Sequence, residues 1–307
     1  MKGRQSHPPL PMVVALAVEG SDGRARKRRS PPSSPSPSLS FGTADFAGGL
    51  ASRRIPALRV AFVGQLLGLP VMVAGLLLVD GTLSSRALWW GAAAGLAGGL
   101  GILAFYRAMA DGPMSVVAPV TALLTAVVPV VAGVGLGERP DAVAWAGVAL
   151  ALVAIALVTR DPSRAAAHAS GPVGPTIGRA LLAGTLFGLA FVAFSRPGDV
   201  AGLWPLLGSR LASLPVFGLL VVVTRTGVAV PDEARRPTAA SGVLDMLANV
   251  FVLEAFTRGL LTLVSVVTAL YPATTLLLAR FVLDERIRRD QVAGLALAAV
   301  AVIMISL

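Results

Sequence analysis

Long apolar stretches follow one another along most of this chain, and they constrain its fold more than any other feature. After residue 40, short polar breaks such as ADGP (110–113) and GERPD (137–141) separate these stretches. Most are long enough to form a helix of about 20 residues, which crosses the roughly 30 Å hydrocarbon core of a bilayer. Charged residues make up 14% of the chain, against about 25% in a typical soluble domain. The sequence therefore predicts an all-α polytopic membrane protein.

Ten candidate transmembrane helices can be placed by this criterion. They cover residues 39–51, 57–79, 87–109, 114–136, 141–159, 177–195, 202–225, 239–258, 262–283 and 289–307. The first is short and contains Asp45, so it is marginal for crossing the bilayer.

The segment before the first helix has a different composition. Residues 1–38 are basic and rich in Pro and Ser, which predicts a disordered N-terminal segment. If residues 19–38 were removed, Val18 would join Leu39 and complete a full span. We therefore hypothesise that residues 19–38 interrupt the first helix.

The chain contains an internal repeat. Residues 104–160 align without a gap with residues 251–307 at an offset of 147, with 19 identities in 57 positions. Both copies of the most similar segment end on Glu-Arg, at 138–139 and 285–286. The earlier helices correspond more loosely: Phe41-Gly42 and Leu69-Pro70 parallel Phe187-Gly188 and Leu214-Pro215.

The repeat fixes the expected architecture. Residues 39–160 and 177–307 each hold five predicted helices, and an odd number makes the second unit enter the membrane from the opposite side. Two inverted repeats are typical of secondary transporters, whose substrate site lies near the membrane midplane between the repeats.

Three segments carry a resemblance to a known family. They are FYRAMADGPMSVVAPVTALLTAVVPVVAGVGLGER (105–139), AGVALALVAIALV (146–158) and the second copy ending in LDER (283–286). Over residues 41–307 the chain resembles EamA-type members of the drug/metabolite transporter superfamily. The resemblance implies ten helices, alternating access and export of small metabolites, often amino acids or drugs, across the plasma membrane. It also implies that the fifth and tenth helices are peripheral and that the others surround a central cavity.

Polar residues inside the predicted spans are the candidates for substrate binding. An ionisable side chain at the bilayer centre costs at least about 2.5–3.5 kcal/mol and usually faces a cavity. Asp245 and Asn249 are four residues apart and share one helix face. The candidate substrate-binding residues are Asp245, Asn249, Arg210, Tyr271 and Asp45.

Each candidate also has a structural explanation. Asp245 and Asn249 can form a buried hydrogen-bonded pair. Arg210 can neutralise Asp245 instead of attracting a carboxylate. Asp45 can bind a proton or a cationic substrate, or it can simply mark the end of a short helix.

Four residues are candidates for gating. Arg107 and Glu254 occupy equivalent repeat positions and would form an ion pair across the pseudo-twofold axis, unless both extend to the membrane interface from helix ends. Pro119 and Pro272 lie inside predicted helices, where proline frees a carbonyl and kinks the helix. Such kinks can line a transport path or serve packing alone.

Other chemistries find little support in the sequence. The chain has no Cys and two His, both in polar segments, so we expect no metal site, no cofactor and no catalytic residue. The basic run RARKRR (24–29) suits anionic lipid rather than nucleic acid. The expected partners are a small-molecule substrate, the lipid bilayer and, in a homodimer, a second copy. The alternatives to a transporter are a membrane-embedded enzyme acting on lipid and a non-transporting scaffold.

The distribution of arginines among the loops and the family resemblance indicate opposite orientations of the protein in the membrane. Loops after the first, fifth, seventh and ninth spans contain twelve Arg, and loops after the second, fourth, sixth and eighth contain four. The positive-inside rule places the twelve in the cytoplasm. The family resemblance implies that both termini are cytoplasmic, which is the opposite orientation. The sequence leaves both orientations open.

Overall fold

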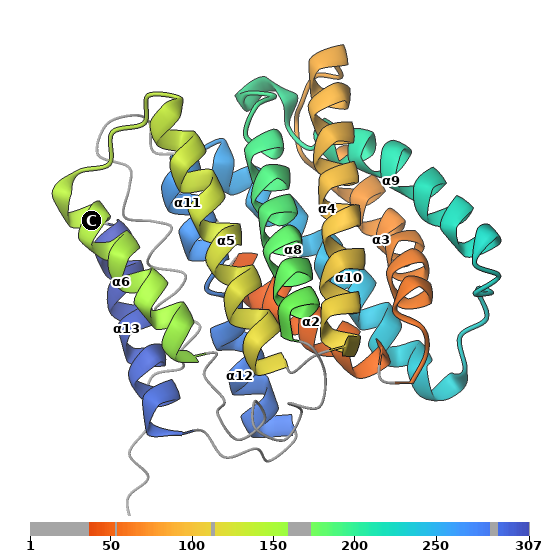
Figure 1. Cartoon of the computed structure of the whole chain (residues 1–307). Helices are drawn as coiled ribbons and strands as arrows, with labels where there is room; N and C mark the ends of the chain where they lie inside the picture. Colours follow the sequence, from red (N-terminus) through yellow and green to blue (C-terminus); the bar gives the residue numbers. More distant parts are fainter. Residues whose placement is uncertain (1–36, 53, 112–113, 159–172, 283–287, 307) are drawn as a thin grey trace, which may run out of the picture.

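The computed structural model describes residues 37–52, 54–111, 114–158, 173–282 and 288–306. Within these ranges all regular structure is helical (Figure 1). The helices are α2 (Pro37–Ser52), α3 (Ala57–Leu78), α4 (Ser85–Asp111), α5 (Met114–Gly135), α6 (Ala142–Val158), α8 (Val173–Phe194), the 3-10 turn η1 (Asp199–Ala201), α9 (Trp204–Val223), α10 (Asp232–Phe256), α11 (Leu261–Thr268), α12 (Tyr271–Val282) and α13 (Arg289–Ser306). Each of the ten predicted spans has a counterpart, so the predicted all-α polytopic fold is confirmed.

Local sequence explains where several helices begin. The Ser84 Oγ accepts a hydrogen bond from the Ala87 N–H at 3.1 Å, and the Asp141 Oδ1 accepts one from the Ala144 N–H at 2.8 Å. These contacts satisfy amide groups that have no partner inside α4 and α6. Pro56 and Pro231 stand immediately before α3 and α10.

The sequence places the start of α10 too late. The helix begins at Asp232, whereas residue 239 was predicted from the apolar pattern. Asp232 and Glu233 occupy its first turn, where acidic side chains interact favourably with the helix dipole. Residues 232–238, which precede the predicted start, are therefore helical.

The ninth span is not one continuous helix. α11 ends at Thr268 and α12 begins at Tyr271, with Pro272 in the first turn of α12. Proline is tolerated in a first turn because an amide there needs no intrahelical partner. The equivalent position in the first repeat is Thr125, and α5 runs unbroken through it. A kink at Pro272 inside one continuous helix was expected, and the structure instead has two helices, with the break between Thr268 and Tyr271.

The hypothesis about residues 19–38 falls almost entirely outside the described residues. Its last two members, Pro37 and Ser38, are the first residues of α2 and are buried. The predicted disorder of residues 1–38 also lies outside the described ranges, apart from these two.

Among the described residues, five helices are long and apolar enough to cross a membrane by length and composition. These segments are Ala57–Leu78, Ser85–Phe105, Pro175–Phe194, Trp204–Val223 and Asp232–Phe256. Shorter apolar helices accompany them, including Ala142–Val158. Large apolar side chains such as Leu78 and Phe281 are 84% and 77% exposed. Such exposed apolar surface is expected where a protein faces lipid chains.

The helices pack as two intertwined repeats. α4 packs on α8 and α9, and the equivalent helix α10 packs on α2 and α3. α6 packs on its own equivalent α13 at one edge of the molecule (Figure 1). Most of the large helix–helix interfaces therefore join one repeat to the other, and they occur in equivalent pairs.

Close glycine contacts confirm this symmetry at residue level. A methyl group added at Gly95 would collide with the carbonyl oxygen of Ser209, and one added at Gly242 would collide with that of Gly64. Gly95 and Gly242 are 147 residues apart, and Gly64 and Ser209 are 145 apart, as are Leu69 and Leu214. Small residues allow membrane helices to approach closely. The same contact is thus made twice, as an inverted repeat requires.

Candidate functional site

A cavity of about 140 Å³ lies between the two repeats. Its lining residues come from α2, α3, α4, α5, α8, α9, α10 and α12. α6 and α13 supply none of the described lining residues, which agrees with the peripheral position implied by the family resemblance. Gly98 and Asp245 line the cavity from near the middle of α4 and α10. The cavity therefore lies at the level where the repeats cross.

One end of the cavity is charged. The Arg210 Nη2 on α9 lies 3.2 Å from the Asp245 Oδ2 on α10, and the two side chains are 11% and 30% exposed. Burying a charged group away from water costs free energy unless it is paired with an opposite charge, so each of these two side chains stabilises the charge of the other. The Asn249 side chain donates to the Asp245 carbonyl oxygen at 2.8 Å. This contact orients the Asn249 side chain back along α10 toward Asp245.

Arg210 has donor capacity that this pair does not use. A guanidinium carries five N–H donors, and the contact with Asp245 involves Nη2. The Nε is buried and finds no acceptor among the described side chains and backbone groups. Buried donors without partners are rare in folded proteins. An anionic group could pair with Nε only if the side chains that cover it move, because this atom is not exposed to the cavity.

A second polar pair extends this end of the cavity. The Ser213 Oγ on α9 donates to the Gln65 Oε1 on α3 at 2.7 Å. Gln65 and Arg210 are 145 residues apart, like Gly64 and Ser209. The sequence analysis did not select Gln65. Its polarity inside an apolar span and its equivalence to Arg210 were the signals that could have identified it.

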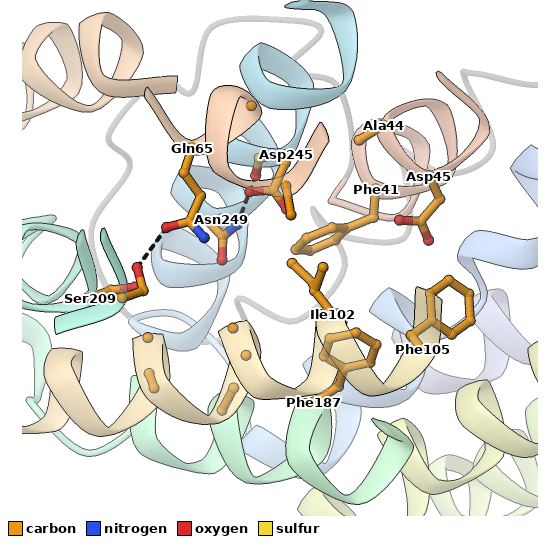
Figure 2. A pocket seen from close by; sticks show the side chains of 18 of the residues that line it. Phe41, Ala44, Asp45, Gln65, Ile102, Phe105, Phe187, Ser209, Asp245 and Asn249 are labelled. Atoms are coloured by element: carbon orange, nitrogen blue, oxygen red, sulfur yellow. Dashed lines mark hydrogen bonds between the residues drawn. The ribbon is translucent and has the colours of Figure 1, made fainter. Parts of the chain in front are cut away.

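The other end of the cavity is aromatic. Phe105 and Phe187 pack edge to face with centroids 6.2 Å apart, and Phe41 lies 6.3 Å from Phe191. Figure 2 shows Phe41, Phe105 and Phe187 on the opposite side from Gln65 and Asn249, and Asp45 lies on the side of these rings in this view. Sequence reasoning missed these rings because an apolar residue in an apolar span gives no signal of its own.

Comparison with known proteins identifies the family. The model of the EamA-like transporter family matches residues 36–160 and 175–307. The chain belongs to the EamA-like transporter family. A crystal structure of a protein with 18% sequence identity matches with a TM-score of 0.70 over 89% of this chain and 99% of its own. At that identity the likeness supports the fold alone. No curated protein sequence matches the chain significantly.

The five residues predicted to bind substrate all line this cavity of the EamA-like chain. They are Asp45, Arg210, Asp245, Asn249 and Tyr271. Tyr271 reaches the cavity because it begins α12 directly after the helix break. Residues from four helices, α2, α9, α10 and α12, are thus brought together in one place.

Of the two alternatives for Arg107 and Glu254, the ion pair between them does not form in the structure. Glu254 pairs at 2.8 Å with Arg258, one turn further along the end of α10. Arg107 is exposed near the end of α4, which leads into the start of α5. The far end of α5 leads to Glu138, which contacts Leu261 in the segment that follows α10. Arg107 and Glu254 therefore lie at opposite ends of the bundle.

The inverted repeat itself explains why this pair does not form. A twofold axis in the membrane plane carries a residue at one membrane face to the other face, and only residues near the midplane meet their equivalents. Of the two prolines predicted to gate, Pro272 is buried at the start of α12. Pro119 lies within α5, and its side chain falls outside the described residues.

Proposed function

We propose that this EamA-like protein is a secondary transporter of the plasma membrane that exports small zwitterionic metabolites, such as amino acids, by alternating access. The observation that carries the proposal is the Arg210–Asp245 pair in the wall of a cavity between two inverted repeats. The family membership supports transport in general, and the composition of the cavity supports the class of substrate.

The charge pair favours a zwitterion over a simple ion. A zwitterion can place its carboxylate on the Arg210 guanidinium and its ammonium on Asp245, so both members of the ion pair keep a partner. A substrate with one charge would compete for one member of the pair and leave the other unpaired, which is strongly unfavourable in a low-dielectric site.

The volume of the cavity and its aromatic lining restrict the substrate class further. A cavity of about 150 Å³ can hold a molecule the size of benzene, and this one measures about 140 Å³. The rings at the far end offer apolar contact to the rest of the solute. A small amphipathic molecule with a charged head fits both ends.

The proposal predicts that transport requires both charges. Culture-medium metabolites would be compared by mass spectrometry between cells expressing the wild type and cells expressing Asp245→Asn. We expect the wild type to enrich a few zwitterionic compounds, and the variant to reduce that enrichment by at least about tenfold, equivalent to about 1.4 kcal/mol. Asp232→Asn is the matched control, because Asp232 lies on the same helix with its side chain 83% exposed.

A double variant separates function from stability. Asp245→Asn alone leaves the Arg210 charge buried without its partner, which can destabilise the protein by about 3–5 kcal/mol. R210Q/D245N removes both charges, so it should fold well and still fail to transport. Normal export by a folded double variant would overturn the proposed site. Altered lipids without any change in the medium would favour the membrane enzyme, and no change in either would favour the scaffold.

A further inference from the structure

The two halves of the cavity are built from equivalent helix stripes that differ in chemistry. Asp245 and Asn249 line it from α10, and their equivalents at the offset of 147 are Gly98 and Ile102 on α4. The close contacts of Gly95 and Gly242 establish this register independently. The second repeat therefore supplies a carboxylate and an amide at the two positions where the first supplies a glycine and an apolar side chain.

Gly98 differs from the other glycines on α4. Methyl groups added at Gly95 or Gly99 would collide with Ser209 or with the Phe217 ring. One added at Gly98 would meet only the Ala190 Cβ of α8, at an ordinary contact distance of 3.8 Å. Helix packing therefore explains Gly95 and Gly99 but leaves Gly98 without a structural reason to be glycine.

The space beside Gly98 is cavity space. Gly98, Ile102 and Phe105 all line the cavity and follow one another at helical spacing along α4. Ala190 lines the cavity from α8. Any side chain at position 98 would consequently occupy volume that is now open to a bound solute.

We propose that Gly98 determines the largest substrate that this transporter accepts. This inference rests on the proposed function. With the charged head of the solute held by Arg210 and Asp245, its apolar group lies in the space beside Gly98 and Ala190. A larger residue at position 98 excludes bulky apolar groups and leaves small ones unaffected.

The test is a size series on both the protein and the solute. Purified wild type, G98A and G98V would be reconstituted into liposomes, and uptake of radiolabelled L-alanine, L-leucine and L-phenylalanine would be measured. One methylene in an apolar pocket changes discrimination by about 10- to 200-fold. We expect G98V to lower phenylalanine transport by at least about tenfold relative to alanine, and G98A to shift the ratio in the same direction by less.

Gly49 on α2 provides the matched control. A methyl group added there meets nothing within 4 Å, and Gly49 is not among the lining residues. G49V should leave the ratio of the three rates unchanged. If G98V folds poorly, G98A carries the test, because its added methyl makes only the ordinary contact with Ala190.

The outcomes distinguish the inference from the proposed function. Equal loss of all three solutes in G98V and G98A, or no loss in either, overturns the role of Gly98 while the wild-type activity still supports transport of amino acids. If the wild type carries none of the three, the proposed substrate class fails, and the inference fails with it.

Discussion

Arg210 carries more hydrogen-bond donors than its surroundings use. The sequence leaves two roles open for it, neutralising Asp245 or attracting a carboxylate. The contact at 3.2 Å shows that it pairs with Asp245, and the unpartnered Nε shows that this pairing does not satisfy the whole guanidinium. Because Arg210 lines the cavity and its side chain is 11% exposed, it can neutralise Asp245 and still offer its guanidinium to a carboxylate.

Arg210→Lys separates these roles. Lysine keeps the positive charge that neutralises Asp245 but loses the planar fork that binds a carboxylate with two hydrogen bonds. We expect R210K to fold normally and to raise the KM for amino-acid uptake into liposomes by about tenfold or more, the loss of about 1.4 kcal/mol of binding. Wild-type kinetics in R210K would show that neutralisation alone is required.

At the scale of elements, one carboxylate joins the two repeats. Glu138 follows α5 and accepts hydrogen bonds from the first two amides of α11, with Oε1 2.6 Å from the Leu261 N and Oε2 2.9 Å from the Thr262 N. A negative charge at a helix N-terminus is also stabilised by the helix dipole. The equivalent Glu285 lies outside the described residues.

Glu138→Gln should weaken this connection between the repeats. The amide keeps one acceptor oxygen and turns its NH₂ group toward the second backbone donor. Hydrogen bonds to charged groups contribute about 1.5–3 kcal/mol each, so we expect a clear fall in the thermal unfolding temperature in detergent. Asp80→Asn, at an exposed acid before α4, should leave the temperature unchanged. An unchanged temperature in E138Q would mean that the contact is dispensable.

The elements also show how far a sequence can be interpreted. Spans were predictable because apolar length is a local property, and Asp245 and Arg210 were conspicuous because charge is rare in such spans. The start of α10 was missed because Asp232 and Glu233 are polar yet favourable in a first turn. Gln65 could have been selected by its polarity, whereas Phe41 and Gly98 could not, since their significance depends on which helices meet around the cavity.

At the scale of the molecule, α9 offers a direct test of orientation. Val200 precedes it and Val228 follows it, with exposures of 73% and 55%, so the two residues flank opposite ends of a spanning helix. Arg225, Arg235 and Arg236 lie near the Val228 end, and Arg196 lies near the other. The positive-inside rule therefore places Val228 in the cytoplasm.

Cysteine labelling can check this placement, because the chain has no Cys of its own. We expect V200C to react with a membrane-impermeant thiol reagent in intact cells, and V228C to react only after permeabilisation. The reverse pattern would mean that the family orientation holds and that the arginine bias does not determine topology here. The same substitution at both positions makes each variant the control for the other.

The interlocked packing has a consequence for how the protein is made. Because α2 and α4 of the first repeat pack mainly on α8, α9, α10 and α12 of the second, the first five helices have few lasting partners when they leave the ribosome. Until the second repeat follows, Gln65 and the glycine faces of α4 meet lipid or other helices instead. Biogenesis therefore passes through an interval in which half of the protein is inserted but unassembled, exposed to membrane chaperones and proteases alike.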